Sequence, residues 1–419
     1  MLCRGWRDAS HPHVGGGALQ LRTAGDQRER DGDRRGLRAA VSGHQRTLPD
    51  PDLRSTQADS SANADALISR DIRYTDTVRL HLIVVAIVLA SCGGATTPPA
   101  TSPSPQVAGA TPIATAPPSP SPAPSPSARP ISAVLERIDP AKLNDHMVAL
   151  ASFGSRDARN PNHAKAVAYL KEQLGAIPGV ALQSHRAAYN GIPLENILAV
   201  VDPLTAAPPE GWLMICAHYD SISNRSPGWS PATTVAPGAD DNGTGTAALL
   251  EYARILAQER ASLRQRIVLA FFDGEELFFK GSAAYLGSLD SPPPYAAVIN
   301  IDMVGFNPLA DRLDLIWYTA ASAGLRDRMI AANDRYQIGV SPLQPQLATS
   351  GATILDAAPF GLAGIPAVAI VQRYGENDAT FPGNYTFHTV NDTPDKVTNK
   401  RLWLKAAKLT LATALELAR

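Results

Sequence analysis

From residue 131 to residue 419 the chain alternates short apolar runs with segments of helical periodicity, and this alternation most constrains its fold. The apolar runs predict strands at 196–201, 212–217, 267–272, 297–301, 313–318 and 367–371. Apolar residues at helical spacing predict helices at 132–152, 162–175, 244–258, 282–289, 323–333 and 399–417. Strands that alternate with helices form largely parallel sheets covered on both faces. We therefore expect an α/β fold, a three-layer αβα sandwich with a mostly parallel mixed central sheet.

Side chains that can bind a metal stand just after apolar, strand-like runs. They are His218 in LMICAHYD, Asp241 in PGADDNGTG, Glu276 in RIVLAFFDGEE, Asp302 in AVINIDMVG and His388 in FHTVNDT. Open α/β sheets bind ligands at the carboxyl ends of their strands, so residues far apart in the sequence would meet at one edge.

Three carboxylates and two imidazoles form a donor set that suits borderline metal ions. Such a set can hold two cations about 3.5–4 Å apart, with Asp241 as the ligand shared by both. Glu275, next to Glu276, remains free to move protons. The pattern therefore predicts a metal-dependent hydrolase.

The first 77 residues do not read as a folded domain. Twelve arginines and eleven acidic residues are scattered through them without a sustained apolar period. Such a segment cannot bury enough apolar surface to offset the entropy of the chain. Residues 1–77 are therefore predicted to be a disordered or non-native N-terminal extension, with Val78 as the natural start.

Residues 78–92 are predicted to be a lipoprotein signal peptide. Their apolar run at 82–90 is too short to span a bilayer but has the length of a signal-peptide core. The string Leu89-Ala90-Ser91-Cys92 resembles a bacterial lipobox, in which the cysteine becomes the lipidated N-terminus. The alternative is a short buried helix that ends in an incidental Cys92.

Residues 93–130 consist almost entirely of Pro, Ser, Thr, Ala and Gly, a composition typical of an extended linker. The order of these segments predicts an extracytoplasmic, membrane-anchored lipoprotein at the cell surface or in the periplasm, with an anchor at Cys92, a spacer and then a domain at 131–419.

The formal net charge of −1 argues against a nucleic-acid partner. Cys216 lies in an apolar run and is predicted to be a small buried side chain.

Taken in order along the chain, five motifs resemble those of the co-catalytic di-zinc aminopeptidase family: HYD, PGADDNGTG, GEE, NIDMVG and FHTVNDTPD. That family contains bacterial leucyl aminopeptidases and aminopeptidase Y and is related to glutamate carboxypeptidase and the glutaminyl cyclases. The resemblance covers residues 132–415 and is specific because the motifs match together. It implies a peptidase with two Zn²⁺ ions per chain that removes N-terminal residues from peptides with a free amine.

The resemblance also implies a role for each site residue. One zinc would be bound by His218 and Asp302, the other by Glu276 and His388, and both by Asp241. Glu275 would be the catalytic general base, which deprotonates the water that bridges the metals and later protonates the leaving amine.

Neighbouring positions carry further implications of the resemblance. Asp220 would accept a hydrogen bond from the ring of His218, and a cis peptide bond would join Asp241 to Asn242. Phe387 stands where some members of the family have a tyrosine that stabilises the oxyanion. Because phenylalanine cannot donate a hydrogen bond, the metals or Tyr385 would have to serve instead.

A second departure concerns the Ser-Asp-His string that often precedes Ala-Pro-Phe in the family. Here the string reads Leu355-Asp356-Ala357, so any substrate contact of that histidine is in doubt. The alternatives are a glutaminyl cyclase-like enzyme with a single zinc, a carboxypeptidase, or an inactive peptide-binding lipoprotein. Cyclases of this kind usually lack the full ligand set, whereas all five ligands and Glu275 are present here.

Overall fold

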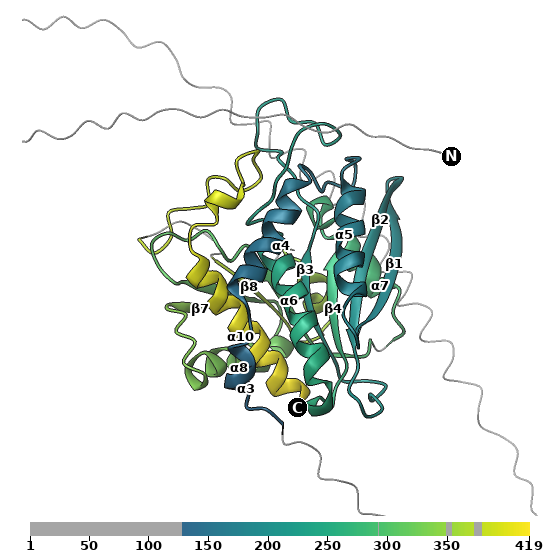
Figure 1. The fold of residues 1–419 in the computed structure, drawn as a ribbon, viewed down its shortest axis with the longest axis vertical. Helices are drawn as coiled ribbons and strands as arrows, with labels where there is room; N and C mark the ends of the chain where they lie inside the picture. The colour runs from purple at the N-terminus through teal and green to yellow at the C-terminus, as the bar shows by residue number, and fades with distance from the viewer. Residues whose placement is uncertain (1–127, 292, 349–353, 373–378) are drawn as a thin grey trace, which may run out of the picture. The chain divides into compact units, whose positions relative to one another are not determined.

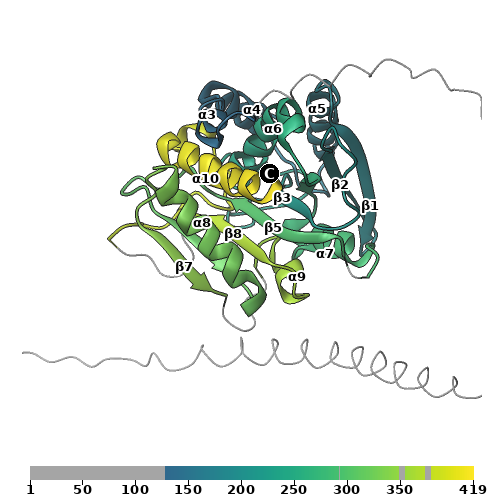
Figure 2. The same ribbon diagram turned by 90° about the horizontal axis from the view of Figure 1, so that it is seen from below.

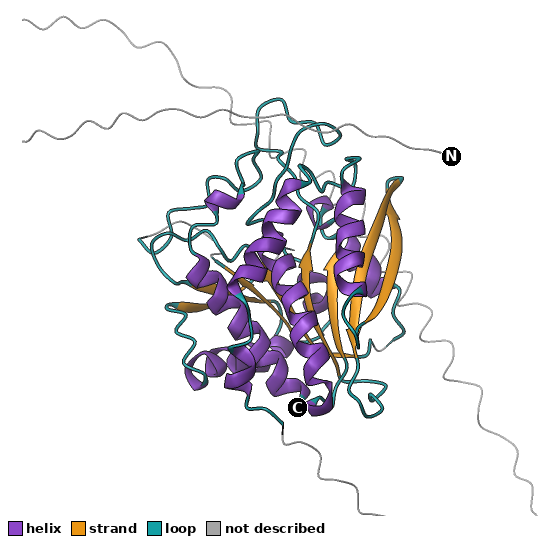
Figure 3. Cartoon of the chain, in the orientation of Figure 1, coloured by secondary structure: helices purple, strands orange, loops and turns teal. Residues whose placement is uncertain are grey.

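The computed structural model describes residues 128–291, 293–348, 354–372 and 379–419. In this part of the chain, an eight-stranded mixed sheet carries helices on both faces (Figures 1 and 3). The predicted extension, the signal peptide with Cys92 and the linker up to residue 127 lie outside the described residues, so membrane anchoring stays a prediction from the sequence. Within the described ranges, no helix combines the length and apolarity needed to cross a membrane.

The strand order in the sheet is β1-β2-β4-β3-β5-β8-β6-β7. The strands are β1 (Ala181–Tyr189), β2 (Ile192–Val201), β3 (Trp212–His218), β4 (Ile267–Phe272), β5 (Tyr295–Asp302), β6 (Leu313–Trp317), β7 (Leu343–Leu347) and β8 (Ala367–Val371). The centre, β4-β3-β5-β8, is parallel, and so is the β6–β7 pair. β2 joins β1 and β4 in antiparallel fashion, and β6 joins β8 in the same way. The predicted fold class is confirmed.

One face of the sheet buries the larger of two apolar cores under helices, most of which Figure 2 shows on one side of the strands. These helices are α3 (Ile131–Leu135), α4 (Pro140–Ser152), α5 (His163–Gly175), α6 (Gly243–Glu259), α8 (Ala323–Arg335) and α10 (Lys400–Ala418). The opposite face packs against the short helices α7 (Lys280–Gly287) and α9 (Ala358–Leu362). Cys216 is fully buried in this second core, as predicted.

Two features of the secondary structure differ from the sequence prediction. The helix expected at 132–152 is two helices, because α4 starts afresh at Pro140, where the carboxylate of Asp139 accepts the N–H of Ala141. The edge strands β1 and β7 were not predicted. The residues of β1 are exposed or half-buried, so its sequence lacks the apolar run that marks the central strands.

Candidate metal centre

Three of the predicted site segments stand where the sequence places them, at the carboxyl ends of parallel central strands. His218 is the last residue of β3 and pairs with Phe272 at the end of β4. A short 3-10 helix, η2 (Glu275–Leu277), follows β4 and carries the two glutamates. Asp302 ends β5. Because neighbouring parallel strands end level with one another, these side chains meet at one edge of the sheet.

The prediction that Asp241 and His388 also follow strands directly is wrong. Asp241 lies just before α6, and the side chain of Asn242 accepts the N–H of Gly245 at the start of that helix. The peptide bond between Asp241 and Asn242 is cis, as the resemblance implied. His388 lies in the loop between β8 and the 3-10 helix η4 (Pro394–Lys396). Pro382, Gly383 and Asn384 interrupt the aromatic residues before it, so no strand forms there.

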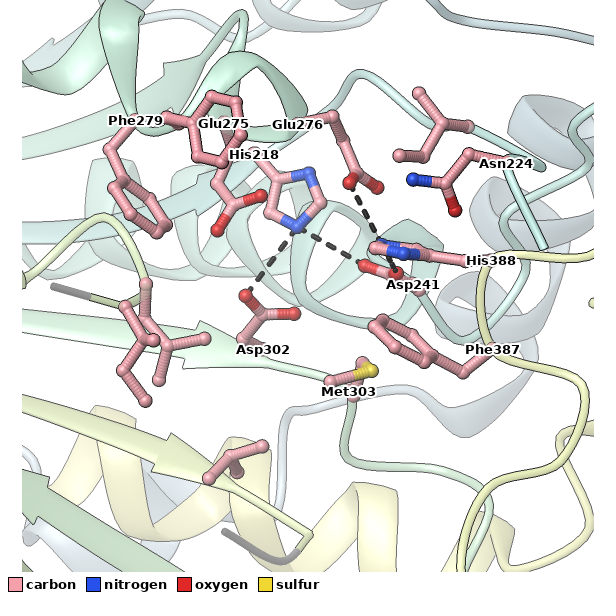
Figure 4. Close-up of a pocket in the computed structure, with 15 residues that line it drawn as sticks. His218, Asn224, Asp241, Glu275, Glu276, Phe279, Asp302, Met303, Phe387 and His388 are labelled. Carbon is pink, nitrogen blue, oxygen red and sulfur yellow. Dashed lines mark ion pairs between the residues drawn. The ribbon is translucent and has the colours of Figure 1, made fainter. Parts of the chain in front are cut away.

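All five predicted ligands nevertheless converge, as Figure 4 shows. Nε2 of His218 lies 3.3 Å from Oδ1 of Asp241 and 3.4 Å from Oδ2 of Asp302. Nε2 of His388 lies 3.1 Å from Oδ2 of Asp241 and 2.8 Å from Oε2 of Glu276. Asp241 therefore turns one carboxylate oxygen toward each histidine.

The donor atoms fit zinc. Ligands around a tetrahedral zinc with bonds of about 2.0–2.1 Å lie about 3.4 Å apart, close to the separations found here. Oε1 of Glu276 and Oδ1 of Asp302 are buried and have no hydrogen-bond partner within the described part of the chain. Buried carboxylate oxygens without a proton donor call for a cation. The residues present therefore suit two metal ions.

Without metal, the two histidines are the cations of this acidic cluster. Burial lowers the pKa of His218, but Asp302 and Glu275 outweigh burial and raise it well above 6.5. Burial likewise opposes the charge on His388, yet Glu276 and Asp241 raise its pKa to about 10. Burial acts the other way on carboxylates and, helped by Asp241, raises the pKa of Glu276 to about 7.

Removal of metal should therefore make folding stability fall as the pH rises. The folded-state pKa is raised for both His388 and Glu276, from 6.5 and 4.5 respectively. Stability from a raised pKa is complete below the unfolded value and is lost as pH rises through the folded value. In EDTA, the melting temperature should fall steadily from about pH 5 to about pH 10, and scanning fluorimetry would measure it. A flat or rising profile would contradict this assignment, and the zinc-loaded protein is the control with the smaller slope.

Glu275 lies on the His218 side of the centre, beside Asp302 (Figure 4). The donor atoms of His218, Glu275 and Asp302 lie within 4.8 Å of one another, and so do those of His218, Asp241 and Glu276. Burial raises the pKa of Glu275 well above 4.5, while the charge of His218 opposes this. A half-buried carboxylate at this position can accept a proton from a group held between the two sets.

Asp220 connects His218 to the two glutamates. Nδ1 of His218 hydrogen-bonds to the backbone carbonyl of Asp220 at 3.2 Å and lies 3.4 Å from Oδ1 of the same residue, the side chain that the resemblance implied. The same carboxylate accepts the backbone N–H groups of Glu275 and Glu276, at 3.2 Å each. Asp220 therefore fixes both the ring of one predicted ligand and the backbone that carries the predicted base.

Asp392 plays the corresponding part for Asp241. Its two carboxylate oxygens accept the backbone N–H groups of Asp240 and Asp241, at 3.0 Å each. Asp240 in turn accepts the N–H of Gly305 and the side-chain amide of Asn384. Burial and the nearby Asp241 raise the pKa of Asp392 to about 7. The sequence offered only its place in FHTVNDT as a signal.

Arg156 was not predicted from the sequence. Its guanidinium is fully buried and donates to the backbone carbonyls of Tyr219, Pro237 and Gly238. These carbonyls belong to the loop that follows His218 and to the loop that carries Asp241. Burial lowers the pKa of Arg156 to about 10, so it remains a cation at neutral pH behind the acidic cluster. An arginine in a Gly-Ser-Arg-Asp loop gives no sequence signal of such burial.

The metal centre opens into a cavity of about 370 Å³. Its walls combine the site residues with apolar side chains: Ile222, Phe278, Phe279, Met303, Ile354, Leu355, Val371 and Phe387. Tyr385, considered as a donor to the oxyanion, is not among the described residues that line this cavity. It is 69% exposed, and its ring packs edge-on against Phe306.

The sequence pattern of Peptidase family M28 matches residues 196–414, more than half of the chain. The chain belongs to peptidase family M28. The resemblance to the aminopeptidase family seen in its motifs is thereby confirmed, as is the predicted enzyme class, a metal-dependent peptidase. Each predicted ligand of this M28 peptidase falls within the matched range.

Curated relatives agree with the family assignment. The M28 peptidase is 29% identical to the uncharacterized protein YfbL of Escherichia coli, over 58% of its own length and 76% of that of YfbL. It is 24% identical to leucine aminopeptidase 1 of Coccidioides posadasii, over 69% of its own length and 74% of the relative. Aminopeptidase YwaD of Bacillus subtilis is 26% identical over 50% of this chain and 41% of the relative.

Solved structures share the fold of this M28 peptidase. The LapA aminopeptidase of Legionella pneumophila superposes with a TM-score of 0.56 at 19% identity, over 69% of this chain and 74% of LapA. The glutaminyl cyclase of Porphyromonas gingivalis gives a TM-score of 0.54 at 22% identity, over 67% of this chain and 99% of the cyclase. At these identities the comparison supports the architecture alone.

Proposed function

We propose that this M28 peptidase is an aminopeptidase that holds two zinc ions and removes N-terminal residues from peptides with a free amine. One observation carries the two-metal part of the proposal: Asp241 turns one oxygen toward His218 and the other toward His388. A carboxylate between two separate ligand groups is what a shared metal ligand requires. The residues that would hold the metals are His218, Asp241, Glu276, Asp302 and His388.

Two zinc ions bound there would act as Lewis acids and lower the pKa of a water molecule between them to about 7. The chain itself supplies the proton acceptor. Glu275 lies half-buried beside the ligands, with a carboxylate oxygen within 4.8 Å of the donor atoms of His218 and Asp302. Its side chain can therefore take a proton from water and return it to the leaving amine.

The cavity suits a peptide N-terminus. Its floor carries the proposed metal ligands, among them Asp241 and Glu276, so a metal ion held there would bind the lone pair of a free amine, which an acylated amine does not offer. Its apolar walls, among them Phe279, Ile354 and Leu355, favour an apolar side chain on the first residue. We therefore propose that peptides beginning with a large apolar residue are preferred.

Turnover of three chromogenic substrates tests the proposal. Leucine p-nitroanilide should be cleaved with a kcat/KM about 100-fold above that of its N-acetylated form, because only the first offers a free amine. Aspartate p-nitroanilide should be cleaved more slowly than the leucine substrate, since its carboxylate would lie against apolar walls. EDTA should abolish activity, and two equivalents of zinc should restore it. Equal cleavage of blocked and free substrates, or full activity with one zinc, would refute the proposal.

The same structure bears on the alternatives. A single-zinc cyclase needs one ligand set, whereas both sets and Glu275 are assembled here. A carboxypeptidase would accept a peptide with a blocked N-terminus and a free carboxylate, so a substrate panel of both kinds separates it from an aminopeptidase.

A further inference from the structure

His388 is held less firmly by secondary structure and burial than the other four candidate ligands. It stands on a loop, and its side chain is 20% exposed. The other four ligands end a strand, lie in η2 or precede a helix, and their side chains are only 1–5% exposed. The backbone of His388 also has a φ of 57°, which is uncommon for a residue other than glycine. Neighbouring residues must therefore hold this ligand in place.

Asn384 holds one side of this segment, since its side-chain oxygen accepts the N–H of Phe387, and Arg225 holds the other. Its backbone N–H donates to the carbonyl of His388 at 3.0 Å, and its guanidinium Nη1 donates to the carbonyl of Phe387 at 3.0 Å. The guanidinium carbon also lies 5.5 Å from the centre of the Phe387 ring. In the same loop, the hydroxyl of Ser226 accepts the N–H of Val390 at 2.9 Å. Two hydrogen bonds from Arg225 and one to Ser226 thus join this loop to the segment around His388.

The ring of Phe387 connects Arg225 to the side chain of His388. It stacks on the imidazole of His388, with ring centres 3.7 Å apart and planes inclined by 26° (Figure 4). The guanidinium, the phenyl ring and the imidazole form a column that we call the Arg225 stack: Arg225, Phe387 and His388. The plane of the imidazole decides where its Nε2 points, and Nε2 is the atom beside Asp241 and Glu276.

We propose that Arg225 is a positioning residue for the metal position of His388, Glu276 and Asp241, and that it has no such role at the position of His218 and Asp302. The inference rests on the proposed two-metal function. It follows from the supports described above: the strands fix His218 and Asp302, whereas His388 depends on the Arg225 stack. One of the two zinc ions should therefore be held selectively by Arg225.

Zinc titration of the metal-free protein by calorimetry tests the proposal, with Arg225→Ala as the variant. The wild-type protein should bind two equivalents. In the variant, one equivalent should bind about 10–100-fold more weakly, the usual effect of removing a group that orients a metal ligand, while the other keeps its affinity. Cobalt(II) absorption, read at one and at two equivalents, gives a second measurement that does not depend on activity.

Arg326→Ala is the matched control. Arg326 also lies over an aromatic ring, 4.5 Å from the centre of Trp317, but it belongs to α8 and touches no site residue in the described structure. Its removal should leave both zinc affinities unchanged. Should Arg225→Ala fail to fold, Phe387→Leu removes the ring from the Arg225 stack and must weaken the same equivalent.

Each outcome of the titration decides between the two proposals. If Arg225→Ala binds two equivalents as the wild type does, this inference is wrong and the proposed function stands. An equal loss of zinc affinity at both positions in Arg225→Ala would also overturn this inference, because Arg225 would then stabilise the fold and not one metal position. If the wild type binds a single zinc, the two-metal function itself fails, and the inference fails with it.

Discussion

Replacing Glu275 with Gln should lower kcat by about 10²–10⁴-fold while both zinc ions stay bound. Glutamine has nearly the size and shape of glutamate, but its amide cannot accept a proton. The backbone N–H of residue 275 would still donate to Asp220, so η2 should keep its place. Steady-state rates on leucine p-nitroanilide, together with metal analysis of the purified variant, measure both parts of this expectation.

Glu276→Gln is the matched control, since it makes the same change one residue further on. Oε2 of Glu276 lies 2.8 Å from Nε2 of His388, and its Oε1 is buried without a partner in the described structure. This variant should lose zinc as well as activity. If Glu275→Gln keeps its activity, or if it loses metal as Glu276→Gln should, Glu275 is not the base.

Asp241→Ala should abolish binding of both zinc ions and lower kcat/KM by at least about 10³-fold. Among the described residues, Asp241 is the one whose two oxygens face different histidines, so both ligand sets lose a member with it. Metal analysis after gel filtration, with activity measured in parallel, tests the expectation.

Asp302→Ala is the control for Asp241→Ala, because it removes a ligand proposed to bind one zinc ion and not both. Asp302 contacts His218 and not His388 among the ion pairs of the centre, so its removal should cost one zinc and leave the other. Retention of one tightly bound zinc by Asp241→Ala would show that Asp241 does not bridge. In that case Asp241→Ala and Asp302→Ala would each keep one zinc ion in metal analysis.

The sequence predicts the part of the site that depends on strands. A buried parallel strand needs a continuous apolar run, so its end is visible wherever a polar residue follows. This signal placed His218 at the end of β3 and Asp302 at the end of β5, and it located the glutamate pair after β4. The central sheet was predictable for the same reason.

The rest of the site depends on contacts that leave no periodic signal. Asp241 and His388 stand in loops whose paths are set by distant partners such as Asp392 and Arg225. Motif resemblance identified these two ligands, but the pattern of apolar residues misplaced them after strands. The edge strand β1 escaped prediction because most of its side chains face solvent.

The buried guanidinium of Arg156 shows that the site depends on residues before the segment that the M28 pattern matches. The M28 pattern starts at residue 196, yet the cation that links the loop after His218 to the loop of Asp241 comes from a segment well before that residue. Helix α4, which leads into this segment, packs against α6, the helix that follows Asp241. The smallest fragment able to assemble the active site is therefore longer than the stretch by which its family is recognised.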